Sequence, residues 1–288
     1  MCLIGVDIGG SHISAAKVEL KDREARIFDF VEADVDAFGS VDKILKTWSE
    51  LILKAAGNAT DFRIGIAMPG PYDYFNGISL IKDQGKLLSL YGLSVRNLLA
   101  ERLEIIPEKI VFINDAEAFL SGESYAGAGR DFQNSIGITL GTGLGSAIKV
   151  YEVVKDAKLW TAPFRTGIAE DYLGTGWFIR FAKEQFGKEI TGVKDLLGAG
   201  FDEEIANSIF EEFGITLGEF LFPYIIRLHS EGVVLGGKVS LAADRFLPVT
   251  HKYLAHRGYN LPIKVSPLGE KSALIGSVLT FLDLETER

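Results

Sequence analysis

Asp115 stands where an apolar segment of the sequence ends and a helical one begins. It follows KIVFIN and precedes AEAFLSGE, which places it at the carboxyl end of a predicted strand and the start of a helix. An aspartate in that place commonly caps the helix, but α/β sheets also form their ligand sites at this edge. A carboxylate there could accept the proton of an alcohol that attacks a phosphoryl group. Asn114 beside it could bind a second hydroxyl.

Asp7 lies inside an apolar predicted strand, just before Gly9 and Gly10. A carboxylate is costly to bury there without a partner or a cation. One interpretation is an aspartate that caps the turn after the strand. The other, which the neighbouring glycines favour, is a carboxylate that faces a nucleotide-bound Mg²⁺ through water, because Mg²⁺ gives up its hydration shell reluctantly.

Three glycine turns follow apolar segments and could bring backbone N–H groups close to phosphate oxygens. They are Gly9-Gly10-Ser11-His12, Gly141-Thr142-Gly143 and Gly236-Gly237-Lys238. None has the spacing of a Walker A loop or of a dinucleotide-binding GxGxxG turn. Each alone is more simply an ordinary hairpin, but the set of three favours a bound nucleotide.

Two of these turns belong to a repeated segment. GVDIGGSHISAAKV, from Gly5, and GITLGTGLGSAIKV, from Gly137, have the same residue at six of fourteen positions at an offset of 132. Glycine and β-branched residues recur in any hairpin, so chance similarity is one explanation. The alternative is a duplicated domain, in which each half presents one glycine hairpin to a shared cleft.

The elements that would position these residues alternate between strand and helix. Strands are expected over residues 2–9, 11–20, 25–33, 62–68, 110–114, 231–236 and 261–265, and as a second hairpin over 135–151. Ser40 is expected to cap a helix that ends at Gly57, and residues 270–284 to form a closing helix. We expect an N-terminal domain over 1–116, a second domain over 117–270, and a helix over 271–288 that packs back on the first domain.

Composition excludes several classes of function. The chain has 288 residues and a net charge of −9, which argues against a general nucleic-acid surface. No apolar run is long enough to span a membrane, and the N-terminus enters a strand with no room for a signal peptide. Cys2 is the single cysteine, so neither an internal disulfide nor a multi-cysteine zinc site can form. A cytoplasmic protein is the expectation.

In order along the chain, these motifs resemble the ROK family (repressors, open reading frames and sugar kinases) of the actin-like ATPase superfamily. DIGGSH is similar to the first phosphate loop, MPGPYDYFNG to the loop at the sugar site, and INDAEAFLSGE to the catalytic stretch. LGTGLG is similar to the second phosphate loop, VVLGGKVS to the adenosine loop, and SPLGEKSALIGSV to the closing segment. The chain lacks an N-terminal helix-turn-helix, so it resembles the kinase branch of the family.

The resemblance implies an α/β fold of two actin-like (ribonuclease H-like) domains, each a mixed five-stranded sheet flanked by helices, with the active site in the cleft between them. It implies phosphate transfer from ATP with Mg²⁺ to a hexose, glucose being the default, by a homodimer. Asp115 would be the base, and Gly70, Asn114, Asp115 and Glu170 would bind the sugar. The nucleotide would contact Gly9, Gly10, Ser11, His12, Gly141, Thr142, Gly143, Gly236 and Gly237, with Asp7 facing the metal.

The chain departs from the family in two places. Residues 151–166 contain neither the cysteines nor the histidine of the family's zinc motif, so we expect no zinc and a rebuilt wall of the sugar pocket. Trp160, Phe164 or Arg165 could stand in, and the spacing does not choose between them. His12 replaces the usual lysine, and a neutral imidazole would weaken the local positive charge. These departures keep two alternatives open: a sugar sensor with little activity, and an enzyme that acts on a small non-sugar acid.

Overall fold

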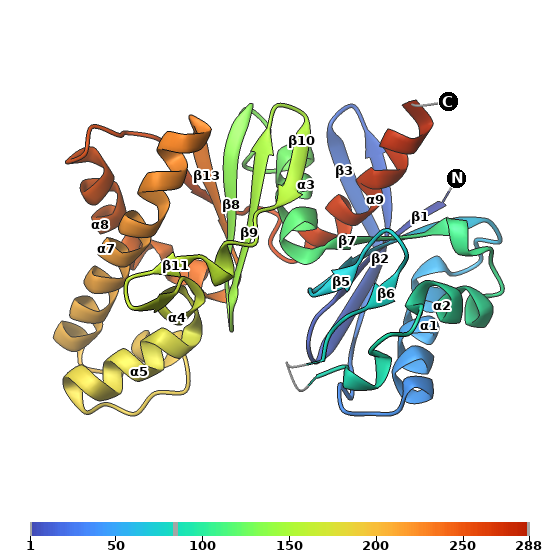
Figure 1. The fold of residues 1–288 in the computed structure, drawn as a ribbon, viewed down its shortest axis with the longest axis horizontal. Helices are drawn as coiled ribbons and strands as arrows, with labels where there is room; N and C mark the ends of the chain where they lie inside the picture. Colours follow the sequence, from blue (N-terminus) through green and yellow to red (C-terminus); the bar gives the residue numbers. More distant parts are fainter. Residues whose placement is uncertain (1, 83–85, 287–288) are drawn as a thin grey trace. The chain divides into compact units, whose positions relative to one another are not determined.

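The computed structural model describes residues 2–82 and 86–286 (Figure 1). The chain divides into two compact units, one made of residues 1–130 and 270–288 and the other of residues 131–269. Each unit contains one five-stranded mixed sheet with helices packed against it. Within the described ranges, no helix combines the length and the apolar character that a membrane span requires.

The sheet of the first unit has the order β3-β2-β1-β4-β7. Its strands are β1 (Cys2–Ile8), β2 (His12–Lys21), β3 (Glu24–Asp34), β4 (Phe62–Met68) and β7 (Ile110–Asn114). The first three are antiparallel, whereas β1, β4 and β7 run parallel. The helices are α1 (Val41–Ala56), α2 (Val95–Leu103), α3 (Asp115–Ala126) and α9 (Lys271–Thr286), and short elements are β5 (Tyr72–Asp73), β6 (Ile78–Ser79), η1 (Leu88–Leu90) and η2 (Pro107–Lys109).

The helix α9 returns from the end of the chain to pack against β1 and β4 (Figure 1). Gly5 and Gly65 lie side by side on those strands, and a β-carbon on either would collide with the α9 backbone. On the other face, Ile4 and Val6 join a core that includes Trp48 of α1. Glycine on one face and branched residues on the other therefore let helices cover both sides of the sheet.

The sheet of the second unit has the order β10-β9-β8-β13-β14. Its strands are β8 (Asn134–Leu140), β9 (Leu144–Val150), β10 (Val153–Asp156), β13 (Gly232–Gly236) and β14 (Ile263–Val265). The remaining elements are η3 (Leu159–Thr161), β11 (Pro163–Phe164), β12 (Gly167–Ile168), α4 (Glu170–Leu173), α5 (Thr175–Phe186), α6 (Val193–Leu196), α7 (Glu203–Leu228), η4 (Lys238–Ala242) and α8 (Ala243–Ala255). Phe178, Phe213 and Phe246 pack ring against ring in its core.

The two sheets repeat the same topology, which supports duplication over chance similarity. In each, an antiparallel meander of three strands is followed by two parallel strands. The strands β1 and β8 also share one pattern of burial along their seven residues. The repeat that is visible in the sequence therefore extends to the order of the strands and to the side chains that each first strand buries.

The boundary between the units lies after Arg130, whereas the expected boundary at residue 116 assigned the helix after Asp115 to the second domain. In the structure this helix, α3, packs against α9 inside the first unit. Gly122 and Gly276 allow the close approach, because a β-carbon on either would collide with the backbone of the other helix. The buried carboxylate of Glu123 also accepts a 2.6 Å hydrogen bond from Ser272 Oγ.

Candidate active site

The first glycine turn joins β1 to β2 through four residues, 9–12. Gly9 N–H donates to the His12 carbonyl (2.9 Å), and Val35 N–H donates to the Ser11 carbonyl (2.8 Å). A β-carbon on Gly9 would lie only 2.6 Å from His12 Cε1, so the lack of a side chain lets the imidazole lie over the turn. Ser11 and His12 are exposed there, as residues that meet a ligand must be.

Lys86 is a second basic residue at this turn, and the sequence analysis did not identify it. A β-carbon on Gly10 would lie 3.1 Å from Lys86 Cδ and 3.2 Å from its Nζ. Lys86 is 76 positions further along the chain than Gly10, so no local motif connects the two residues. The first turn thus has an imidazole beside Gly9 and an ammonium group beside Gly10.

Asp7 lies two residues before this turn, on the last part of β1, with a partly exposed side chain. Burial, followed by the negative charges of Asp115 and Glu270, raises the pKa of its carboxyl to about 7. Glu270 immediately precedes α9, far along the chain from Asp7. No local motif therefore connects the two residues. The turn-capping alternative for Asp7 is not what the structure shows, because Gly9 N–H bonds to His12 instead.

The acidic residues of this unit suit a hydrated cation better than a directly ligated one. Within residues 2–82 and 86–286, no three His, Cys, Asp or Glu side chains converge closely enough to hold a metal ion. Mg²⁺ commonly keeps several waters and binds through one or two carboxylates together with phosphate oxygens. The pair Asp7 and Asp115 fits an ion of that kind, which phosphates and water would complete.

Asp115 begins α3, at the carboxyl end of β7, but the N-cap is Asn114. Asn114 Oδ1 accepts hydrogen bonds from the N–H groups of Ala116 (3.0 Å) and Glu117 (3.1 Å). Asp115 Oδ1 accepts from the next N–H, that of Ala116, at 2.8 Å. Capping is therefore the work of Asn114 rather than of Asp115, and the Asp115 carboxyl is partly exposed at the edge of the sheet.

Tyr74 links Asn114 to the loop that contains Gly70. Asn114 Nδ2 donates to Tyr74 Oη (3.1 Å), which donates to the Met68 carbonyl (3.0 Å). A β-carbon on Gly70 would lie 3.3 Å from the same hydroxyl. Of the expected sugar-binding residues, Gly70 and Asn114 thus both lie against one tyrosine, and Asp115 follows Asn114 in the chain.

The second glycine turn joins β8 to β9 through three residues, 141–143. Gly141 N–H donates to the Gly143 carbonyl (3.0 Å). The Gly141 carbonyl accepts from both the N–H and the hydroxyl of Thr175 (2.9 and 2.8 Å), which anchors the turn to α5. The exposed Thr142 is left at the tip of the turn.

Glu170 supports this second turn. It begins α4, and its Oε2 accepts a 2.9 Å hydrogen bond from Leu144 N–H. The same oxygen lies so close to Gly143 that a β-carbon there would collide with it. The Glu170 carboxylate at the start of this helix is therefore not simply solvated, because it bonds to the turn.

The third glycine turn, after β13, packs on the second. Gly237 has a φ of +81°, and a β-carbon on it would collide with the carbonyl of Leu140, the last residue of β8. The Gly237 carbonyl accepts a 2.7 Å hydrogen bond from Ser240 Oγ. Gly237 therefore packs against the end of β8, the strand that leads into the turn at 141–143.

Arg165 is the residue of segment 151–166 that ties this part of the chain to α7. Its guanidinium pairs with Glu219 (2.7 Å) and Glu212 (3.4 Å). It also lies over the rings of Phe164 and Tyr172, 5.6 and 5.5 Å from their centroids. Trp160 is 38% exposed.

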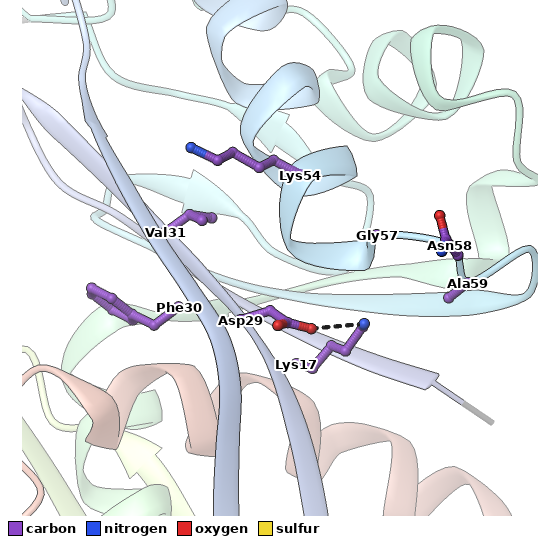
Figure 2. Close-up of a pocket in the computed structure, with 8 residues that line it drawn as sticks. All are labelled: Lys17, Asp29, Phe30, Val31, Lys54, Gly57, Asn58 and Ala59. Atoms are coloured by element: carbon purple, nitrogen blue, oxygen red, sulfur yellow. Dashed lines mark hydrogen bonds and ion pairs between the residues drawn. The ribbon is translucent and has the colours of Figure 1, made fainter.

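A surface hollow of about 500 Å³ lies elsewhere on the first unit (Figure 2). It is lined by Lys17, Asp29, Phe30, Val31, Lys54, Gly57, Asn58 and Ala59. Lys17 Nζ and Asp29 form an ion pair of 2.8 Å across it. None of the expected site residues lines this hollow, so it adds nothing to the site.

Two curated relatives align with the chain. A glucokinase of Thermotoga maritima is 31% identical over 146 residues, which is 51% of this chain and 44% of that protein. The chain therefore spans less than half of that glucokinase. An N-acetylgalactosamine kinase, AgaK, of Shewanella sp. is 22% identical over 96% of this chain and 95% of its own length.

A solved structure and a family model complete the comparison. The ROK family glucokinase of Streptomyces griseus, in complex with glucose and AMPPNP, superposes with a TM-score of 0.77 at 20% identity, over 97% of this chain and 99% of that one. This likeness shows the actin-like fold. Residues 3–160, more than half of the chain, match the model of the ROK family. The protein belongs to the ROK family.

Proposed function

We propose that the protein is an ATP-dependent sugar kinase that transfers the γ-phosphate to a hexose hydroxyl, with Asp115 as the general base. One observation carries this proposal: the Asp115 carboxyl is not the helix cap and interacts electrostatically with Asp7, two residues before a glycine turn. A base, a metal-facing carboxylate and a phosphate-binding turn thus occur in one unit. Phosphoryl transfer requires little else from a protein than these groups and the positioning of its substrates.

In the proposed reaction, Asp115 accepts the proton of the sugar hydroxyl as its oxygen attacks the γ-phosphorus. The bond between that phosphorus and the bridging oxygen of ADP breaks, and ADP leaves with the electron pair. Mg²⁺, when bound, neutralises phosphate charge and is held through water by Asp7. N–H groups of the turns at 9–12 and 141–143 bind phosphate oxygens, and the turn at 236–237 lies under the adenosine.

The acceptor is a hexose, with glucose as the default. The curated relatives bear the names of a glucokinase and an N-acetylgalactosamine kinase, which supports a hexose and leaves its C2 substituent open. We assign hydroxyl contacts to Gly70, Asn114, Asp115 and Glu170. Tyr74 supports Asn114 and the loop of Gly70 through its hydrogen bonds with Asn114 Nδ2 and the Met68 carbonyl.

We also propose that the enzyme works without zinc, in the cytoplasm and as a homodimer. The ion pairs of Arg165 with Glu212 and Glu219 hold its segment to α7, which is the kind of constraint that a structural metal would otherwise impose. A zinc content below one-tenth of an equivalent in the active, metal-analysed protein is expected. A measured content of one equivalent of zinc, whose removal by a chelator also abolishes activity, would contradict this proposal.

Release of ADP, measured over a panel of hexoses, N-acetylhexosamines and small acids, tests the activity. We expect turnover with at least one hexose. Asp115→Asn should lower kcat by three or more orders of magnitude while AMPPNP binding stays within threefold, because only the base is removed. Sugar-induced thermal shifts without any turnover would favour the sensor, and turnover with an acid alone would favour the non-sugar enzyme.

A further inference from the structure

Lys86 places an ammonium group against the first glycine turn, a position without an assigned role in the mechanism above. Its Nζ would lie 3.2 Å from a β-carbon on Gly10. The glycine leaves room for this side chain. Lys86 is exposed, and over residues 2–82 and 86–286 its Nζ forms neither a hydrogen bond nor an ion pair.

The backbone that follows Lys86 is held firmly although the Lys86 side chain is exposed. The next residue, Leu87, is 1% exposed and belongs to the core of the first unit. Leu87 N–H donates to the Ala37 carbonyl at 2.7 Å. Two residues before Ala37, Val35 N–H donates to the Ser11 carbonyl of the glycine turn. Lys86 is therefore connected to the turn through two backbone hydrogen bonds and one buried leucine.

Other lysines of this unit differ from Lys86 in their surroundings. Lys17, Lys43 and Lys109 each pair with an aspartate at 2.7–2.8 Å. Such pairs satisfy the ammonium charge inside the protein. An ammonium that lies over a glycine turn, and that pairs with no carboxylate of the described residues, suits an anionic oxygen as its partner.

The position also indicates which part of the nucleotide this oxygen belongs to. The turn follows Asp7, and Asp7 interacts with Asp115, the proposed base. Since the transferred phosphoryl group must reach the hydroxyl that Asp115 deprotonates, the end of the phosphate chain nearest this turn is the transferred one. A fixed positive charge there opposes the repulsion between that group and the carboxylates of Asp7 and Asp115.

We propose that Lys86 Nζ binds the transferred γ-phosphoryl group of the nucleotide, and so supplies the positive charge that His12 provides only when protonated. This assignment rests on the proposed kinase function, because that function identifies the ligand as a nucleotide. Its consequence is a preference of this site for nucleoside triphosphate over diphosphate. That preference can be measured by binding alone.

The test compares Lys86→Met with Lys86→Arg and Lys54→Met. Lys54 lies at the exposed end of α1, beside the hollow of Figure 2, so its replacement removes the same charge from the same unit at a different place. AMPPNP and ADP affinities are measured by calorimetry with Mg²⁺, together with kcat and KM for ATP where turnover is found. Thermal unfolding verifies that each variant is folded.

For Lys86→Met we expect AMPPNP affinity to fall about tenfold or more while ADP affinity stays within threefold, because charge-assisted bonds to phosphate are among the stronger ones. The value of kcat/KM for ATP should fall at least 30-fold, Lys86→Arg should recover most of it, and Lys54→Met should match the wild type. The assignment is overturned if Lys86→Met loses AMPPNP and ADP affinity equally. It is also overturned if Lys86→Met behaves like Lys54→Met. If no sugar supports turnover in the wild type, the kinase proposal fails, whereas the AMPPNP and ADP comparison still decides the role of Lys86.

Discussion

The two glycine turns have the same fold around them but different charges. The first has four residues and is flanked by His12, Lys86 and, two residues before it, Asp7. The second has three residues and is flanked by the carboxylate of Glu170 and the hydroxyl of Thr175. At the repeat position of Asp7 the second half has Thr139, equally part-buried on an otherwise buried strand.

The one-residue difference in turn length changes the register of the hairpins. Ile8 lies opposite Ile13, whereas Leu140, at the same position of the repeat, lies opposite Leu144. Leu144 is the repeat equivalent of His12, and it is buried whereas His12 is exposed. With this shift, His12 places an imidazole at the first turn, whereas Leu144 places an apolar side chain at the second.

The comparison teaches that duplication kept the buried positions and changed those that meet ligands. The burial pattern of β1 and β8 is the same because the core limits what each position tolerates. The first turn has beside it His12, Lys86 and the Asp7 carboxylate, to which we assign the reacting phosphate and the metal. The second has acquired support for its own backbone, from Glu170 and Thr175.

The largest difference between the halves should appear when Asp7 and Thr139 are replaced in parallel. Asp7→Asn removes the carboxylate that we assign to hydrated Mg²⁺, so kcat should fall about 1,000-fold and the dependence on Mg²⁺ should weaken. Thr139→Val removes only a hydroxyl, and its kcat should stay within fivefold of the wild type. Steady-state rates over a Mg²⁺ titration measure both. Equal losses in the two variants would show that the turns share the metal-linked role.

Much of the fold could be predicted because the signal is local. The repeat at an offset of 132, Ser40 as a helix cap and Gly57 as a helix end all lie within single segments, and Ser40 Oγ does accept a hydrogen bond from Lys43 N–H. The mixed five-stranded sheets were implied by the resemblance to the ROK family, and the structure has them. The domain boundary differed because the partner of α3 is α9, about 150 residues away, and no local pattern shows that contact.

The site was predictable where a motif carries it and not where distant segments meet. Asp7, Asp115 and the glycine turns belong to motifs, but Lys86, Glu270 and Tyr74 reach their partners from other parts of the fold. The choice between Asn114 and Asp115 as the helix cap could not be made either, since both residue types cap well. Arg165 could not be chosen over Trp160 because its partners lie 47 and 54 residues away.

A smaller effect is expected from Glu170, and it separates support of the turn from sugar binding. Glu170→Gln keeps an acceptor for Leu144 N–H, so stability should stay near that of the wild type. Glu170→Ala leaves that N–H without its partner and should cost about 1–3 kcal/mol of unfolding free energy. If Glu170 also binds a sugar hydroxyl, as we propose, both variants raise the hexose KM about tenfold without changing the KM for ATP. A hexose KM that is unchanged in Glu170→Gln would restrict the residue to supporting the turn.

The smallest effect is on the stability of the metal-free protein, and it again distinguishes the halves. An unfolded aspartate loses its proton near pH 4, whereas burial and the charges of Asp115 and Glu270 raise the pKa of folded Asp7 to about 7. Between these values the folded state holds the extra proton, so the contribution of Asp7 to stability is fully present below pH 4 and is lost as the pH rises to about 7. Asp7→Asn has no such proton to lose.

The Tm of Asp7→Asn minus that of the wild type, in EDTA, should therefore rise by a few degrees between pH 5 and pH 8. Thr139→Val, which changes no ionisable group at the equivalent position, should show a difference that is independent of pH. Titrating groups that do not interact with Asp7 are common to all three proteins and cancel in these differences. A flat profile for Asp7→Asn would mean that Asp7 titrates like an exposed carboxyl, and the electrostatic contrast between the two turns would then depend on His12, Lys86 and Glu170 alone.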